Sequence, residues 1–138
     1  MQFRFRTVLI LIPLLAMAAA CDNGPVVTPT PIGPSVTETF SGTLTKNGGV
    51  THTFAATSRG SVTATLTKVD PDSTLAIGVS LGTWNGTSCQ TILSNDATTV
   101  GTGLLATVSG VGNLCLRVYD SAGKVPASEA YSVDVAHP

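Results

Sequence analysis

Charged side chains are scarce in this sequence. Only 11% of its 138 residues are charged, with 7 Lys or Arg against 8 Asp or Glu. Arg4 and Arg6 lie in an N-terminal segment that we expect to be removed, which leaves five basic and eight acidic residues and a net charge of −3. A nucleic-acid-binding protein needs clustered Lys and Arg to neutralise phosphates. The composition therefore argues against a nucleic-acid partner.

The sequence also lacks a segment in which apolar residues recur with the helical period over the length of a helix. It is rich in Thr, Ser, Gly and Val, and apolar and polar residues alternate after residue 37. Turn residues separate the alternating stretches every ~8–12 residues, which predicts seven to nine strands in one antiparallel β-sandwich. The polar residues 94–96 are expected to interrupt this pattern.

No long apolar run is present to cross a bilayer, which needs about 20 residues. The apolar run at residues 7–16 is shorter and contains Pro13. Basic residues precede it, and the small residues of the stretch LAMAAAC (15–21) follow it, which is the order of an export signal. The cysteine indicates a lipobox and predicts that Cys21 is lipidated after cleavage. Ordinary secretion and a transmembrane anchor are the alternatives.

This interpretation divides the chain into three parts. Residues 1–20 are the predicted cleaved signal peptide. Residues 21–37 hold the lipidated Cys21 and a flexible Pro- and Thr-rich tether, in which four prolines favour extended backbone. Residues 38–138 form the predicted sandwich domain, whose length is enough for one core.

Cysteine is rare, with three residues in the chain. If Cys21 carries lipid, Cys89 and Cys115 remain as an even pair in an exported protein, which predicts a disulfide bond. A metal site and a reactive thiol are the alternatives, but neither Cys89 nor Cys115 has a His or Cys nearby at ligand spacing.

Four strand-like segments resemble those of a known bacterial family. They are residues 51–57 (THTFAAT), 60–66 (GSVTATL), 114–120 (LCLRVYD) and 131–135 (YSVDV). In order and pattern they are similar to pre-peptidase C-terminal (PPC-like) domains, over residues 38–137. Asn113 and Leu114 depart from the family, which often has Gly-Thr-Tyr there. The resemblance implies a jelly-roll-like β-sandwich that serves as a non-catalytic accessory module.

Catalytic motifs are few. Residues 78–82 match G-x-S-x-G, but Ser80 lies in an alternating run with no helix after it, so we interpret the match as a coincidence. His52 shares a face with Phe54 and is predicted to be a half-buried, hydrogen-bonded residue rather than a general base. His137, next to the C-terminus, is expected to be frayed. We therefore predict no catalytic residues and no enzyme activity.

Acidic residues fall where loops are expected, and Glu129 is one of them. Extracellular calcium sites gather oxygen ligands from loops, which makes Asp70, Asp72 and Asp120 the calcium candidates. The stretch DPDS (70–73) is too short for an EF-hand loop, and aspartate is also a common turn residue. We expect no cofactor, with calcium as the alternative.

Aromatic residues make up 5% of the chain, and Trp84 is the single tryptophan. Tyr131 is in phase with apolar neighbours, which predicts a core position. Trp84 and Tyr119 are the candidate ligand contacts, since exposed aromatic rings stack on sugars. Packing of Trp84 over a Cys89–Cys115 bridge is the alternative.

These features predict a lipid-anchored protein of the bacterial cell envelope, on the outer side of the cytoplasmic membrane or on the outer membrane. Its PPC-like module would bind a protein or an envelope component. A carbohydrate-binding module at the cell surface is the alternative.

Overall fold

The computed structural model describes residues 35–138 of the chain. The predicted signal peptide, Cys21 and most of the predicted tether lie outside these described residues. The part of the chain that is described contains eight β-strands, and none of it forms a helix that is long and apolar enough to span a bilayer. The strands are β1 (Val36–Thr45), β2 (Gly49–Ala56), β3 (Gly60–Asp70), β4 (Ile77–Trp84), β5 (Cys89–Thr98), β6 (Gly103–Val108), β7 (Gly112–Tyr119) and β8 (Ser128–His137).

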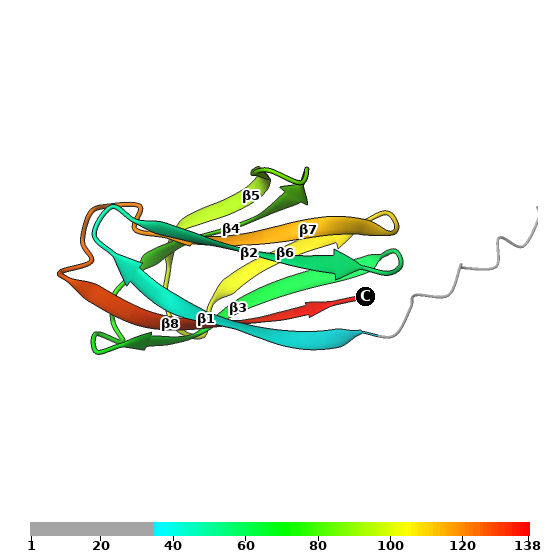
Figure 1. Ribbon diagram of the computed structural model, residues 1–138. Coiled ribbons are helices and arrows are strands. Elements are labelled where there is room, and N and C mark those ends of the chain that lie inside the picture. Colours follow the sequence, from blue (N-terminus) through cyan, green and yellow to red (C-terminus); the bar gives the residue numbers. More distant parts are fainter. Residues whose placement is uncertain (1–34) are drawn as a thin grey trace, which may run out of the picture. The chain divides into compact units, whose positions relative to one another are not determined.

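The strands form two four-stranded antiparallel sheets packed face to face (Figure 1). One sheet has the order β1-β8-β3-β6 and the other the order β2-β7-β4-β5. The β4–β5 connection stays within its sheet, and the other connections cross to the opposite sheet. This interleaved order of eight strands is a jelly roll. The predicted all-β antiparallel sandwich is confirmed.

The core lies between the sheets and follows from the twofold alternation of the sequence. Successive side chains of a strand point to opposite faces, so every second residue is directed inward. Tyr131, Val133 and Val135 of β8 and Leu116 and Val118 of β7 are inward residues and are at most 1% exposed. The predicted core position of Tyr131 is confirmed.

The polar residues 94–96 do not interrupt a strand, and that expectation is wrong. They lie within β5, whose pairing with β4 shifts register twice, between Ile77 and Val79 and between Leu81 and Gly82. Because β5 is an edge strand, these polar side chains can face water. The bulged residues of β5 disturb no further strand, since β5 pairs with β4 alone.

Two expectations about β8 are also wrong. His137 is not frayed: it is 3% exposed, its Nε2 lies 2.9 Å from Glu38 Oε1, and its ring lies 4.9 Å from that of Phe54. Glu129 is not in a loop but near the start of β8, and it is 1% exposed. Both residues belong to the row of inward side chains that pairing with β1 fixes.

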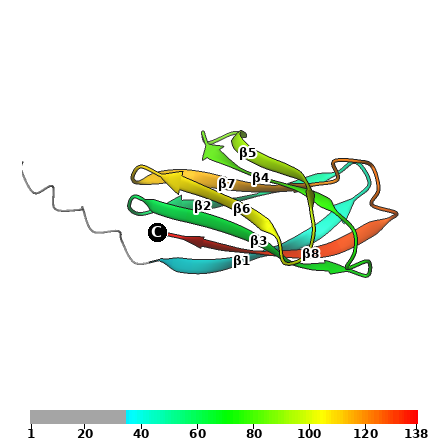
Figure 2. The same ribbon diagram turned by 180° about the vertical axis from the view of Figure 1, so that it is seen from behind.

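The sandwich has two ends, which strand pairing defines. The pairs Val36–His137 and Gly60–Val108 place one set of connections together, which we name the terminal end (right in Figure 1, left in Figure 2). It contains Ser35, Pro138 and the turns at residues 57–59, 85–88 and 109–111. The opposite end, which we name the loop end, contains the connections at residues 46–48, 71–76, 99–102 and 120–127.

Candidate binding site

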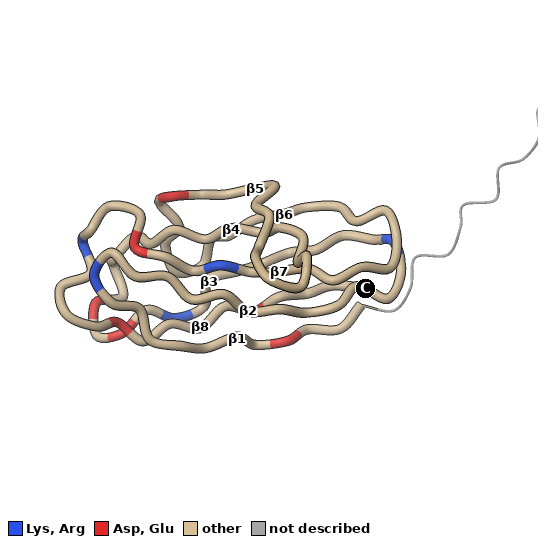
Figure 3. The backbone as a smooth tube through the Cα atoms, turned by 45° about the horizontal axis from the view of Figure 1, so that its top comes forward, with Lys and Arg blue, Asp and Glu red and all other residues tan. Residues whose placement is uncertain are grey.

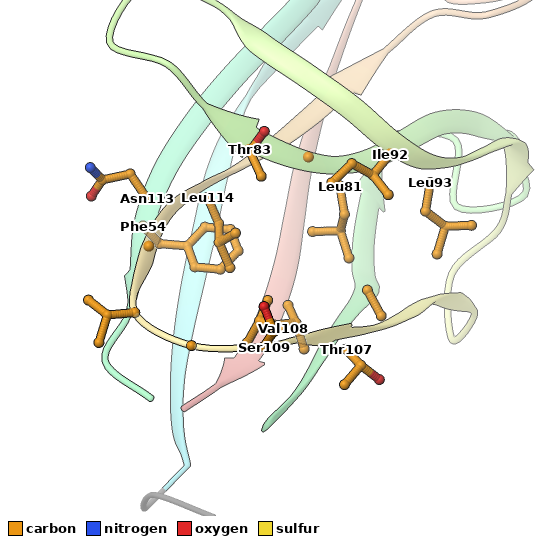
Figure 4. Close-up of a pocket in the computed structure, with 16 residues that line it drawn as sticks. Phe54, Leu81, Thr83, Ile92, Leu93, Thr107, Val108, Ser109, Asn113 and Leu114 are labelled. Carbon is orange, nitrogen blue, oxygen red and sulfur yellow. The ribbon is translucent and has the colours of Figure 1, made fainter. Parts of the chain in front are cut away.

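An apolar pocket of about 310 Å³ opens between the sheets in the terminal half of the sandwich (Figure 4). It lies on the side where the edge strands β5 and β6 face each other, and Figure 4 shows Leu81 and Ile92 across from Val108. Its apolar walls include Phe54, Val62, Leu81, Leu93, Val108 and Leu114. The pocket is therefore an opening of the hydrophobic core itself toward the surface.

Two large aliphatic side chains at the pocket face solvent. Val111, in the β6–β7 turn, is 82% exposed, and Ile92 of β5 is 74% exposed. In the β4–β5 pair, Leu81 is opposite Leu93 and the next residue, Gly82, is opposite Thr91. Ile92 is therefore a bulged residue without a partner in β4. A bulge redirects its side chain. The register shift thus exposes an isoleucine beside an apolar pocket.

The pocket is lined by apolar and neutral polar side chains. None of the described residues that line it is an Asp, Glu, His, Lys, Arg or Cys, and its polar side chains are Thr83, Thr107, Ser109 and Asn113. Ligand pockets are usually apolar with a few polar groups that fix orientation, and about 300 Å³ is at the small end of their range. The arrangement suits a small or slender apolar group.

The sequence does not predict this site. Residues 110–113 (GVGN) are typical of a turn, and no pattern distinguishes Ile92 from its neighbours. An added Cβ at Gly110 or Gly112 would meet no atom within 4 Å, so the chain on both sides of Val111 is in open space. The valine between two turn glycines was the feature that could have indicated the site. An exposed aliphatic side chain does not stabilise a turn in water, so its presence there points to another role.

Ser80 and His52 lie on opposite faces of the sheet β2-β7-β4-β5. Ser80 is 2% exposed in the middle of β4, between the inward residues Val79 and Leu81. His52 points inward from β2, where its Nε2 lies 2.8 Å from the Tyr131 hydroxyl. The two side chains therefore form no nucleophile–base pair. The predicted half-buried, hydrogen-bonded role of His52 is confirmed.

Burial governs the protonation of this pair. Desolvation lowers the pKa of His52 below its usual value of 6.5, and it raises the pKa of Tyr131 to about 12. The rings of Phe40 and Tyr131 lie near the imidazole, at centroid distances of 5.2 and 6.0 Å. The surroundings therefore favour the neutral forms of both side chains.

His52 makes the stability of the domain depend on pH. Since its pKa is lower in the folded state, the unfolded chain binds the proton more readily. The contribution of neutral His52 to the free energy of unfolding is therefore complete above pH 6.5. It decreases as the pH drops through this value toward the pKa of His52 in the folded state. We expect His52→Gln, which keeps a hydrogen-bonding group, to flatten urea-unfolding stability between pH 7.5 and 5 relative to wild type. Equal slopes for the two proteins would contradict this role, since His137 is present in both.

Trp84 and Tyr119 do not share a surface site. Tyr119 pairs with Gly78, six residues before Trp84 in β4, which corresponds to about 20 Å along the strand. Trp84 lines a shallow hollow with Thr51, Cys89 and Arg117. The structure thus offers one aromatic ring at this hollow rather than a row of them.

Tyr119 is occupied by contacts within the domain. Its ring covers Gly78, where a Cβ would collide with it, and its hydroxyl donates to the Asp96 carboxylate. The Arg117 guanidinium lies 5.3 Å from the ring centroid. Burial, followed by the hydrogen bond to Asp96, raises the pKa of Tyr119. The Tyr119 ring therefore buries the start of the outer face of β4, at Gly78.

The predicted disulfide between Cys89 and Cys115 is present, with a Cα–Cα distance of 5.7 Å. Cys115 is fully buried in β7, and Cys89 is the first residue of β5. Strand β4 lies between β5 and β7, and two strand spacings amount to about 10 Å. The start of β5 must therefore bend over the outer face of β4 to reach β7.

The three calcium candidates do not come together. Among the described residues, no group of three or more His, Cys, Asp or Glu side chains is placed to hold a metal ion. Asp72 accepts hydrogen bonds from the amide and hydroxyl of Thr74, which lower its pKa. Asp70 lies 3.9 Å from the Lys68 ammonium on the surface.

Asp120 has a structural role at the loop end. Its carboxylate accepts hydrogen bonds from the backbone amides of Asn47, Lys124 and Val125. Desolvation alone would raise the pKa of Asp120, but these bonds outweigh it and lower the pKa. The residue thus ties the β7–β8 connection to the β1–β2 turn.

The sequence matches no known family model, and no curated protein is significantly similar to it.

Proposed function

We propose that this protein is a lipid-anchored, non-catalytic binding module of the bacterial cell envelope. The observation that carries the proposal is the order of residues before Cys21, in which Arg4 and Arg6 precede an apolar run and a stretch of small residues. A plain export signal requires small residues at its cleavage site but no thiol. A cysteine at this point is what lipid attachment requires.

The described domain supports a binding role. A β-sandwich with an apolar pocket can hold a ligand, and none of the described residues that line this pocket is ionisable. Ser80 of the G-x-S-x-G match and His52 face opposite sides of their sheet. The PPC-like strand motifs favour an accessory module of the same kind, which recognises a protein or an envelope component.

Lipid attachment is tested by Cys21→Ser in a bacterial host fed an alkyne-labelled fatty acid. We expect the wild-type chain to carry the label and to begin at residue 21, because a diacylglyceryl group becomes attached to this thiol through a thioether bond before the signal is cleaved. The variant should lose labelling to background and remain uncleaved. Labelling of the immunoprecipitated protein and mass spectrometry of its N-terminal peptide provide the measurement.

Thr30→Ala is the matched control, because it changes a residue downstream of the signal motif. It should be labelled and processed like wild type. A wild-type protein that is unacylated, or whose mature chain begins elsewhere, would overturn the lipid anchor. Each acyl methylene contributes about 0.8 kcal/mol to membrane binding, so an acylated protein should sediment with the membranes.

A further inference from the structure

The two ends of the sandwich differ in charge (Figure 3). The connections at the loop end, with the strand residues next to them, contain Lys46, Asp70, Asp72, Asp120, Lys124 and Glu129. The turns at the terminal end contain one charged side chain, Arg59. The nearest charged strand residue on β1 is Glu38, whose carboxylate is held by His137. The terminal end can therefore leave bulk water at lower electrostatic cost than the loop end.

Exposed aliphatic side chains have the opposite distribution. Val111 is at the tip of the terminal end, and Val36, 50% exposed, is the first residue of β1 there. Ile92 and Val111 both line the apolar pocket, so pocket and turn form one continuous apolar surface. At the loop end the exposed large aliphatic residue is Val100, which is 39% exposed.

The described domain begins at the end that carries the apolar surface. The described domain begins at Ser35, at the terminal end, beside the pair Val36–His137. Fourteen residues lead from Cys21 to Ser35, and whatever their conformation they span at most about 50 Å. A lipid on Cys21 would hold the terminal end near the bilayer at high effective concentration, where weak contacts suffice.

We propose that the terminal end of the sandwich rests on the membrane surface, with the β6–β7 turn inserted and the apolar pocket occupied by the hydrocarbon chain of a membrane lipid. This inference rests on the proposed lipid anchor and adds to it the ligand class of the pocket. The surface formed by the pocket and the β6–β7 turn is aliphatic, and none of the described residues that line it is ionisable. It lies at the end where the described domain begins, whereas a protein partner could bind equally well at the distant, charged loop end.

The test uses the unacylated mature chain, residues 21–138 with Cys21→Ser and the disulfide formed. It is mixed with vesicles of phosphatidylethanolamine and phosphatidylglycerol, and binding is measured by flotation. We expect the chain with no further substitution to bind these vesicles weakly. Val111→Asp should reduce the partition coefficient about tenfold, because burial of a valine side chain in an apolar environment increases binding by roughly that factor.

Leu105→Asp is the matched control. Leu105 is 67% exposed on β6, a strand that also lines the pocket, but its side chain is on the outer face of the sheet. This variant should bind vesicles like the parent chain. Melting temperature and circular dichroism show whether both variants are folded, and both sites are exposed enough to accept the change.

Three results would overturn the inference: no binding to vesicles, equal losses in the two variants, or binding that high salt abolishes. A dimer that Val111→Asp dissociates, with vesicle binding unchanged, would assign the surface to a second copy instead. Acylation of the full-length Val111→Asp protein in cells reports on the lipid anchor alone, since Cys21 is intact. The two proposals therefore fail separately.

Discussion

Replacing Cys89 and Cys115 with alanine is expected to destabilise the domain by about 3.5 kcal/mol, on the chain-entropy model of disulfides. The bond joins two residues that are 26 positions apart in the sequence. It therefore lowers the conformational entropy of the unfolded chain, in which this segment would otherwise be open. For a domain whose net stability is of the order of 5–15 kcal/mol, the loss is large. We expect a fall in melting temperature of about 15 °C.

Thermal and urea unfolding of the double variant provide the measurement, together with wild type in the presence of a reductant. Reduction leaves both thiols in place, so it separates the cross-link from the packing of Cys115, which is fully buried. We expect the reduced protein and the double variant to be destabilised by similar amounts. A reduced protein that melts like the oxidised one would show that the bridge does not hold the start of β5 to β7.

Gly82→Ala is expected to destabilise the domain by about 3 kcal/mol, the upper range for overpacked sites. A Cβ at Gly82 would collide with the Gln90 carbonyl oxygen and lie 2.7 Å from its carbon. These are backbone atoms of β5, which the disulfide draws over β4, so the neighbour cannot turn aside as a flexible side chain would. The strain must be relieved by displacing the hairpin or the bridge.

Gly112→Ala is the matched control for this substitution. Gly112 is also a strand glycine, but a Cβ there would meet nothing within 4 Å. We expect a change within about 1 kcal/mol, favourable if it reduces the freedom of the unfolded chain. Urea unfolding of both variants, oxidised and reduced, gives the comparison. Gly82→Ala should cost less after reduction, and an unchanged cost would mean that the bridge does not confine β5.

The approximate number of strands and their places along the chain could be predicted from the sequence. Apolar and polar residues alternate with a period of two wherever one face of a strand is buried. Tyr131, Val133 and Val135 show this in β8, and the same pattern continues to His137. The prediction failed where it relied on residue type: His137 and Glu129 are polar, yet the row of inward positions includes them both. Pairing with neighbouring strands determined their burial.

The candidate site was less predictable than the fold. Cys89 and Cys115 could be paired from the sequence because two thiols remained in an exported chain. Ile92 could not be assigned to a pocket, since its exposure depends on a register shift between β4 and β5. Trp84 and Tyr119, which composition suggested as joint ligand contacts, are separated by the length of β4.

The sequence by itself determined the all-β class, the disulfide partners and the expectation of a lipid at Cys21, because alternation, thiol number and signal order are local properties of the chain. Only the tertiary structure decided which ends of the strands meet. Antiparallel pairing brought Val111, Ile92 and Ser35 to one half of the sandwich and placed six of the twelve charged side chains of the described residues at the other end. Such an arrangement depends on contacts between residues far apart in the chain, which no local pattern records.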